Sequence, residues 1–333
     1  MSIHVLAPGW QTSVQDGGRR GHAALGVGAS GAMDDLSRRL ANLLVGNADD
    51  AAALEITLRG PRLRFDADCI VALAGAALDG LPMWRPVAMR AGAEIALGTM
   101  AHGAYAYLAV AGGIGGAPLL GSRSADIAGG LGTPLTAGNV LPVLDAAPDQ
   151  SRSWWHNLFA HHARPLGVPS DNRSALPAIW SLNPRPWFDL DPHNPIGVIE
   201  GAHFAQLADA AQRRLFDTAF RIGGDSSRMG LRLREARLDL REPLELVSAA
   251  VVPGTVQLPP SGDPIVLMAE APTCGGYPRI GHVITVDLPR LAQRRPGDGV
   301  RFAPVALAEA QTRYLERERA LAALKRTIRE RLQ

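Results

Sequence analysis

The stretch Leu54-Glu55-Ile56-Thr57-Leu58-Arg59-Gly60-Pro61-Arg62-Leu63-Arg64-Phe65 decides the fold class of this chain. Apolar and polar side chains alternate on both sides of the Gly60-Pro61 turn, which is the pattern of two short β-strands. An apolar run over 70–73 continues the series. The sequence therefore predicts a succession of short strands separated by tight turns.

Further strands are predicted along both halves of the chain, with glycines between them. They fall at 94–97, 105–110, 196–199, 231–233, 244–247, 265–268 and 283–286. Helices are predicted at 34–45, at 204–216 and, as an amphipathic segment with Leu307, Tyr314, Leu321 and Ile328 at heptad spacing, at 306–332. Short strands at this spacing suit a closed or partly closed barrel, so the predicted fold class is mainly β with few helices.

The length of the chain favours two domains. A sequence of 333 residues, 47% of them hydrophobic, can bury a large core. Each half combines strands with one helix, which indicates a weak internal duplication. We expect a first lobe over 1–150, a connecting segment without clear periodicity over 151–195, a second lobe over 196–305 and a C-terminal helix over 306–333.

The composition disfavours several classes of protein. A formal net charge of +2, 5% aromatic residues and scattered basic residues provide no footprint for nucleic acid. No basic leader and no apolar segment of membrane-spanning length is visible, so we expect a cytoplasmic protein that does not bind membranes. Cys69 and Cys274 lie too far apart to suggest a disulfide framework, and no cluster of histidines and carboxylates has the spacing of a metal site.

A glycine-rich run late in the chain predicts a tight turn between two strands. It reads Pro272-Thr273-Cys274-Gly275-Gly276-Tyr277-Pro278-Arg279-Ile280-Gly281. Its backbone N–H groups and its guanidinium could bind an anion or a carbonyl group together. The alternative is a hairpin turn with no ligand.

A second glycine-rich run, at 26–31, matches the G-x-G-x-x-G pattern and leads into the helix predicted at 34–45. A polar turn precedes it instead of a buried parallel strand, and strands follow it instead of alternating βαβ units, so a dinucleotide-binding fold is disfavoured. The start of the helix could still bind an anion. The alternative is a loop in which the glycines serve geometry alone.

Polar side chains in other turns are candidates for binding. Asp16 lies close to Arg19 and Arg20, and such a carboxylate–guanidinium pair either holds a loop or binds a carboxylate substrate. Gln257 lies between apolar neighbours, where its amide could donate to a carbonyl group or satisfy the backbone.

Motifs in both halves carry a family resemblance. In the first half they are Ser13–Gly21, Gly26–Val27, Ser30–Asp34, Ala41–Asn47 and Leu54–Thr57. In the second half they are Ser226 with Arg228–Gly230, Val252–Gln257, Gly275–Gly281 and Leu291–Asp298. Taken in order, they resemble the allophanate hydrolase subunit 2 family, which includes KipA-like proteins, the C subunit of bacterial 5-oxoprolinase and the carboxyltransferase domain of urea carboxylase. The resemblance extends from Val5 to Phe302.

The resemblance implies two cyclophilin-like β-barrel lobes and membership of an enzyme complex. One version is an ATP-dependent assembly that opens 5-oxoproline to glutamate beside a KipI-like and a LamB/YcsF-like subunit. The other is a carboxyltransferase that moves a carboxyl group from biotin to urea. The sequence has neither a P-loop nor a biotin-accepting lysine motif, so we expect other proteins to carry biotin and most of the ATP-binding machinery.

Two other functions follow from the same resemblance. A KipA-like protein would bind and antagonise a KipI-like kinase inhibitor without turnover. A prolyl isomerase is suggested by the cyclophilin-like fold alone, and analogy of fold does not carry a site. Purified alone, the chain is expected to be inactive in the enzyme interpretation.

Both enzyme chemistries require donors that stabilise charge on an oxygen atom of the lactam, amide or carboxylate, and a group that moves a proton. We expect catalytic roles for Asp16, Arg19, Asp34, Arg228 and Arg279. We expect substrate contacts from Arg20, Gln257, Thr273, Gly275, Gly276 and Tyr277. The alternative for each is loop maintenance and, for Asp34, capping of the helix that follows it.

The sequence departs from the family pattern inside its motifs. Pro272 and Cys274 stand where glutamine and threonine are usual, and Ser227 stands where asparagine or aspartate is usual. The substitutions at Pro272 and Cys274 remove donors from the late glycine-rich run. Tyr277 and Arg279 are therefore its expected contacts, and an altered substrate is consistent with these changes.

Overall fold

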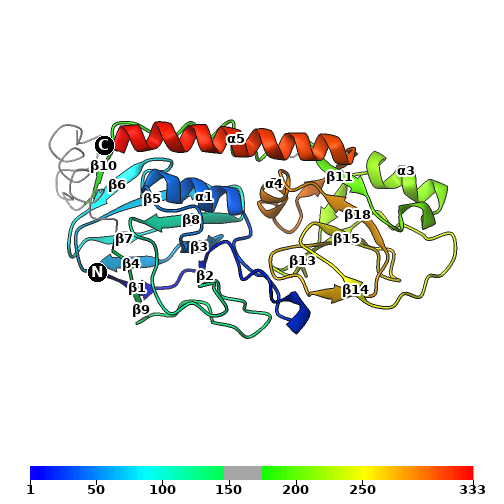
Figure 1. Cartoon of the computed structure of the whole chain (residues 1–333), viewed down its shortest axis with the longest axis horizontal. Coiled ribbons are helices and arrows are strands. Elements are labelled where there is room, and N and C mark those ends of the chain that lie inside the picture. The colour runs from blue at the N-terminus through cyan, green and yellow to red at the C-terminus, as the bar shows by residue number, and fades with distance from the viewer. Residues whose placement is uncertain (146–174, 192, 333) are drawn as a thin grey trace.

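The computed structural model describes residues 1–145, 175–191 and 193–332, which form two β-rich lobes with one long helix lying along both (Figure 1). Strands outnumber helices in each lobe. The prediction of a mainly β fold with two lobes, few helices and a C-terminal helix is confirmed.

The first lobe contains two antiparallel sheets, with strand orders β7-β4-β1-β9 and β10-β6-β5-β8-β3-β2. The strands are β1 (Ser2–Ala7), β2 (Gln11–Gln15), β3 (Ala53–Thr57), β4 (Arg62–Phe65), β5 (Cys69–Gly75), β6 (Pro86–Met89), β7 (Glu94–Ala96), β8 (Tyr105–Val110), β9 (Val140–Pro142) and β10 (Ala175–Pro177). Strand β10 comes from the segment expected to connect the lobes, and it pairs antiparallel with β6. Residues 151–174 of that segment lie outside the described residues.

The central strand β5 is buried on both faces. Val71 and Leu73 lie in the apolar core between the two sheets, whereas Ile70 and Ala72 lie in the cluster beneath helix α1 (Asp35–Leu44). Burial on both faces explains why this strand is a continuous apolar run.

Helix α1 covers the outer face of the six-stranded sheet, as its buried apolar stripe predicts. The Asp34 carboxylate caps the helix by accepting a hydrogen bond from the Ser37 amide at 2.9 Å. The helix ends at Leu44, and Gly46 then adopts a φ of +72°, which reverses the chain. The predicted helix at 34–45 is therefore confirmed.

The second lobe is built on an eight-stranded sheet with the order β19-β12-β13-β16-β15-β18-β11-β20. Its strands are β11 (Ile196–Glu200), β12 (Phe220–Ile222), β13 (Gly230–Arg234), β15 (Thr255–Gln257), β16 (Ile265–Leu267), β18 (Arg279–Val283), β19 (Gly299–Val300) and β20 (Phe302–Pro304). Only Arg301 separates the two edge strands, so the sheet curls until its edges nearly meet. A hairpin-like pair, β14 (Ala249–Ala250) and β17 (Cys274–Gly275), lies beside this barrel.

Short helices complete both lobes. They are the 3₁₀ turns η1 (Ala23–Leu25) and η2 (Phe204–Gln206) and the helices α3 (Asp209–Asp217) and α4 (Leu288–Ala292). The single helix predicted at 204–216 is wrong, because the chain is extended at Leu207 and Ala208 between η2 and α3. Leu207 is fully buried there, and the Ala208 amide bonds to the Asp239 carbonyl, so tertiary contacts override the helical periodicity.

Two predicted strands are also wrong. Residues 244–247 form no strand, and Val247 is 93% exposed, because the chain finds an antiparallel partner only afterwards, at β14. The strand predicted at 283–286 lies earlier, at β18, since residues 279–283 pair with β11 and β15. Within the run at 272–281, which was expected to be one tight turn, Cys274–Gly275 forms β17 and residues 279–281 belong to β18, so only residues 276–278 connect the two strands.

Helix α5 (Leu307–Leu332) lies along both lobes (Figure 1). Leu321 and Ile328 are buried in the apolar cluster that also contains α1. Leu307 and Tyr314 are 58% and 41% exposed, so the predicted apolar stripe is buried only in the C-terminal half of the helix. None of the helices in the described ranges is long and apolar enough to cross a membrane.

Candidate functional site

The two lobes meet at a buried guanidinium. Arg228, in the turn before β13, contacts Glu55 of β3 through Nη1 and donates from Nε to Glu270 Oε1 at 2.6 Å. Its Nη2 donates to the Gly31 carbonyl at 2.6 Å. All three charged side chains are buried. Arg228 of the second lobe is thus held by a carboxylate and a carbonyl group of the first.

Glu55 extends this network into the first lobe. It accepts hydrogen bonds from the Tyr107 hydroxyl at 2.7 Å and from the Met33 amide at 2.8 Å. Burial raises the pKa of Tyr107 well above its usual value, so the phenol stays a donor. Burial lowers the pKa of Arg228, but Glu55 and Glu270 raise it by more, so the guanidinium stays charged. We define Glu55, Tyr107, Arg228 and Glu270 as the seam network.

Asp34 makes a second link between the lobes. Its carboxylate caps α1 and accepts a hydrogen bond from Gln293 Nε2 at 2.7 Å, and Gln293 follows α4 in the second lobe. Gln293 Oε1 accepts from the amides of Ala104 and Tyr105 at 2.8 and 3.0 Å. Burial raises the pKa of Asp34 to about 6 and outweighs the lowering by hydrogen bonds from Ser37 and Gln293.

A cavity of about 440 Å³ opens beside the seam network and has walls from both lobes. Ser226, Ser227 and Glu270 lie in its second-lobe wall, and Thr57 lies in its first-lobe wall. The two serine Oγ atoms already accept backbone N–H groups, from Arg232 at 3.0 Å and Met229 at 3.2 Å. Neither hydroxyl donates a hydrogen bond to another described residue, so both can donate to a ligand. We call this space the interlobe cavity.

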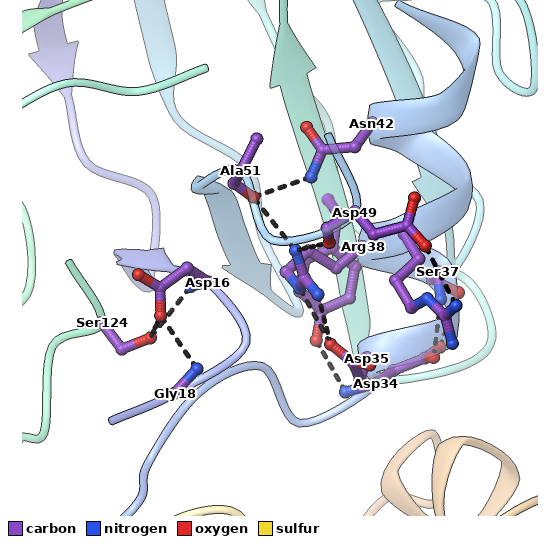
Figure 2. A network of polar contacts seen from close by, with 12 residues as sticks. Asp16, Gly18, Asp34, Asp35, Ser37, Arg38, Asn42, Asp49, Ala51 and Ser124 are labelled. Atoms are coloured by element: carbon purple, nitrogen blue, oxygen red, sulfur yellow. Dashed lines mark hydrogen bonds and ion pairs between the residues drawn. The ribbon is translucent and has the colours of Figure 1, made fainter. Parts of the chain in front are cut away.

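The Asp16 turn is tied to a loop further along the same lobe (Figure 2). Asp16 accepts hydrogen bonds from the hydroxyls of Ser122 and Ser124 at 2.5 and 2.6 Å, and from the amides of Arg123 and Gly18 at 2.6 and 2.9 Å. Burial raises the pKa of Asp16, but these hydrogen bonds lower it by more. The carboxylate is therefore ionised, and its acceptor capacity is used within the protein.

Arg19 and Arg20, adjacent in sequence, lie in opposite environments. Arg19 is buried, contacts the Ser124 carbonyl through Nη2 and lies 3.9 Å from Asp126, so it pairs with Asp126 instead of Asp16. Arg20 is exposed at a depression next to the start of α1. Within 1–145, 175–191 and 193–332 the structure gives the Arg20 side chain no hydrogen bond or ion pair.

Two arginines of α1 are fully engaged. Arg38 donates to Asp35 at 2.6 Å and to the carbonyls of Asp49 and Ala51 at 2.7 and 3.0 Å, and Figure 2 shows these groups around it. Arg39 binds Glu318 of α5 through two hydrogen bonds of 2.8 Å. The two bonds of Arg39 anchor the long helix to the first lobe.

The late glycine-rich run forms a separate group around β14 and β17. Gln257 is buried against Gly275, where an added Cβ would lie 2.5 Å from Gln257 Nε2. Tyr277 is 45% exposed, and Arg279 Nη1 donates to the Ala250 carbonyl at 3.4 Å. Thr273 is half-buried, and its carbonyl accepts the Val251 amide at 3.2 Å.

The structure thus divides the candidate residues into three groups. Asp34 and Arg228 belong to the contact between the lobes. Asp16, Arg19 and Arg20 belong to the turn after β2. The third group, at the hairpin-like pair, contains Gln257, Thr273, Gly275, Gly276, Tyr277 and Arg279.

The carboxyltransferase domain model, which covers subdomains A and B, matches residues 25–304 and so includes most of both lobes. The chain belongs to the carboxyltransferase domain family. Its relatives include the C subunit of 5-oxoprolinase from Escherichia coli strain K12, which is 34% identical in an alignment of 330 positions that covers 94% of this chain and 96% of that protein. The protein of the same name from Haemophilus influenzae is 32% identical over 339 residues, covering 98% and 99% of the two chains.

The fold is shared with larger members of the carboxyltransferase domain family. The crystal structure of the K. lactis urea amidolyase superposes with a TM-score of 0.81 at 25% identity. The match covers 97% of this chain and 20% of that one. The chain therefore spans about a fifth of the length of the urea amidolyase and nearly the whole length of the 5-oxoprolinase C subunits.

The acceptors that hold this carboxyltransferase domain together were not among the predicted site residues. Glu55, Glu270 and Gln293 are buried polar residues. A lone polar residue inside a buried apolar segment needs a partner, and that signal could have identified Glu55, between Leu54 and Ile56, and Glu270, between Ala269 and Ala271. In the described part of the chain, no group of three or more histidines, cysteines and carboxylates is placed to hold a metal ion.

Proposed function

We propose that this chain is one subunit of an ATP-dependent assembly that opens 5-oxoproline to glutamate. The observation that carries the proposal is sequence similarity. The chain is 34% and 32% identical to two 5-oxoprolinase C subunits over 94% and 98% of its length, and 31% and 28% identical to two urea amidolyases.

The interlobe cavity is the proposed position of the substrate. A volume of about 440 Å³ lies within the usual range for small-molecule sites. The Ser226 and Ser227 hydroxyls can donate to the carbonyl oxygen of a lactam, and donors aimed at that oxygen stabilise the charge that develops there. Glu270 lines the same wall and is the carboxylate proposed to accept a proton, although its oxygens also accept hydrogen bonds from Arg228 and from the amides of Ile127 and Ala128.

ATP would supply the free energy for opening the lactam. Partner subunits are proposed to provide most of the residues that bind ATP. The partners proposed are a KipI-like and a LamB/YcsF-like subunit. Biotin attachment to this chain is disfavoured, because the single lysine of the sequence, Lys325, lies in α5 and pairs with Asp49 at 2.7 Å. If the chain instead takes part in carboxyl transfer from biotin, we propose that another protein carries the biotin.

The proposal is tested by reconstitution. The chain is produced together with the two partner subunits, and phosphate and glutamate are measured with 5-oxoproline, urea or other amides as substrate. We expect phosphate release only with all three subunits and 5-oxoproline. An assembled complex that is active with urea instead, or tight binding to the KipI-like subunit without turnover, would contradict the proposal, and the second outcome would favour the regulatory function.

A serine pair provides a matched test of the cavity. Ser227→Ala removes a proposed donor, and we expect a lower kcat/KM for 5-oxoproline in the assembled complex. Ser261→Ala is the control, because Ser261 Oγ also accepts the amide two residues ahead, at 3.3 Å, but lies outside the cavity. Equal kcat/KM in the two variants would remove Ser227 from the substrate site, and a decrease in Arg279→Ala alone would move the site to the hairpin-like pair.

A further inference from the structure

A cleft rich in arginine lies where the first lobe, the second lobe and α5 meet. It consists of an outer hollow of about 510 Å³ and an inner hollow of about 200 Å³, which share Arg20, Arg39 and Arg317 among their lining residues. Arg123 also lines the outer hollow. We call the two hollows together the arginine cleft.

Three guanidiniums of the cleft retain unused donors. The Arg20 side chain has no protein partner in the described ranges. Arg123 uses only Nε, which donates to the Gly116 carbonyl at 2.9 Å. Arg317 Nη1 donates to the Thr285 carbonyl at 3.3 Å, and its Nε lies 3.6 Å from Glu318 without a hydrogen bond. Each guanidinium carries five N–H donors, so most of this capacity is free.

Most carboxylates of the cleft already accept hydrogen bonds from protein groups, including Arg38 and Arg39 of the cleft itself. Asp16 accepts four hydrogen bonds from two serine hydroxyls and two amides. Asp35 binds Arg38 at 2.6 Å, and Asp49 binds Arg39 at 3.1 Å and Lys325 at 2.7 Å. Glu318 forms its two short hydrogen bonds with Arg39. Asp50 is exposed at the rim, which leaves the interior of the cleft with free donors and few free acceptors.

The inner hollow has a different character. Its lining includes Met33, Leu36, Met268 and Leu288, contributed by both lobes. The ring of Tyr314 stands at the outer hollow with the Arg317 guanidinium 5.5 Å from its centroid. A ligand that fits both hollows would combine an apolar or planar body with a group rich in acceptor oxygens.

We propose that the arginine cleft binds a phosphorylated small molecule. Its phosphoryl oxygens accept hydrogen bonds from Arg20, Arg123 and Arg317, and its body occupies the inner hollow. Several guanidiniums around one oxyanion give strong, charge-assisted hydrogen bonds, which favour a phosphoryl group over a neutral ligand. Binding at the cleft is a property of this chain alone and does not depend on 5-oxoproline being the substrate of the complex.

Calorimetric titration of the purified full chain tests this site. Pyrophosphate probes the anion contacts alone, ADP adds a body, and glutamate offers carboxylates instead of phosphoryl groups. We expect saturable binding of ADP and pyrophosphate at one site, with ADP tighter and glutamate at least about tenfold weaker. Arg20→Ala should weaken ADP binding by about tenfold or more, the usual effect of losing a hydrogen bond between charged groups.

Two further variants complete the design. Arg317→Ala should weaken ADP binding by a similar factor, and its circular dichroism spectrum checks that α5 remains folded. Arg64→Ala is the control, because Arg64 is exposed on β4 outside the cleft, and its affinity for ADP should equal that of the unmodified chain. Absence of saturable binding, unchanged affinity in Arg20→Ala or glutamate binding as tight as ADP would each overturn the proposal. Equal affinities for ADP and pyrophosphate would overturn the assignment of the inner hollow.

Discussion

The seam network and the arginine cleft are both built around arginine at the junction between the lobes, but their guanidiniums differ in how many acceptors they find. Arg228 uses Nε, Nη1 and Nη2 on Glu270, Glu55 and the Gly31 carbonyl. Arg20, in the described structure, uses none of its side-chain donors on the protein. One arginine therefore joins the lobes, whereas the other is available to a ligand.

Burial explains why the two regions differ. A charge removed from water is tolerated only when opposite charges and hydrogen bonds compensate it. Arg228 is 7% exposed and meets two carboxylates. Arg20 remains in water at the mouth of a hollow and needs no such compensation. A free guanidinium at an open cleft therefore costs little stability, whereas a free guanidinium at the seam would destabilise the fold.

The largest expected effect is a loss of stability in Arg228→Ala. Removing this guanidinium leaves Glu55 and Glu270 buried without their countercharge, which typically costs about 3–5 kcal/mol. We expect the free energy of unfolding, measured by urea denaturation, to fall by that amount. Arg228→Lys should recover only part of the loss, because one ammonium group cannot serve Glu55, Glu270 and the Gly31 carbonyl together.

The control for this prediction is Arg64→Ala, which removes an exposed arginine from β4. Its free energy of unfolding should remain close to that of the unmodified chain. If Arg228→Ala were as stable as Arg64→Ala, the seam network would not hold the lobes together, and the contrast with the arginine cleft would lose its basis.

Alternation of apolar and polar residues predicted much of the fold. Helix α1 was recovered almost to the residue, because burial of one helix face leaves a periodic pattern in the sequence. Strand β8 was recovered as a continuous apolar run, because all six of its residues are buried. The same reasoning failed at 244–247, where alternating side chains have no neighbouring strand. Periodicity describes the faces of an element, but pairing depends on partners that are distant in sequence.

The candidate site was less predictable for a similar reason. The sequence alone did not distinguish the surroundings of four arginines, because each was expected in a polar turn. They are Arg19, Arg20, Arg228 and Arg279. Their surroundings are set by acceptors far away, such as Glu55 for Arg228 and the Ser124 carbonyl for Arg19. Residue type identified which turns carry charge. Which arginine joins the lobes, which holds a turn and which faces the cleft is set by the tertiary structure.

A smaller effect is expected in the pH dependence of stability. The pKa of Asp34 is about 6 in the folded protein against a reference value of 3.8. Between these values the folded state binds more protons than the unfolded state, so the free energy of unfolding decreases as pH rises from about 4 to about 6. A pKa shift of this size changes the free energy of unfolding by about 3 kcal/mol at most. Asp34→Asn should remove this slope in urea denaturation at several pH values.

Asp16 supplies the opposite sign as a control. Its folded-state pKa lies below the reference value of 3.8, so its contribution is present above that pH and is lost as pH falls through the folded-state pKa. Asp16→Asn should therefore reduce acid sensitivity below about pH 4 and leave the slope between about 4 and 6 unchanged. Parallel stability profiles for Asp34→Asn and the unmodified chain would show that Asp34 does not titrate in this window.

The smallest effect on stability is expected at Arg20, and its neighbour provides the comparison. Arg20→Ala removes an exposed side chain without protein partners in the described ranges, so the urea midpoint should not change. Arg19→Ala removes a buried guanidinium from the Ser124 carbonyl and from Asp126, and unpaired buried acceptors cost about 1–3 kcal/mol. A lower midpoint in Arg20→Ala would mean that this guanidinium is engaged within the fold. An unchanged midpoint in Arg20→Ala, together with a lower midpoint in Arg19→Ala, would show that Arg19 stabilises the fold and that its neighbour Arg20 does not.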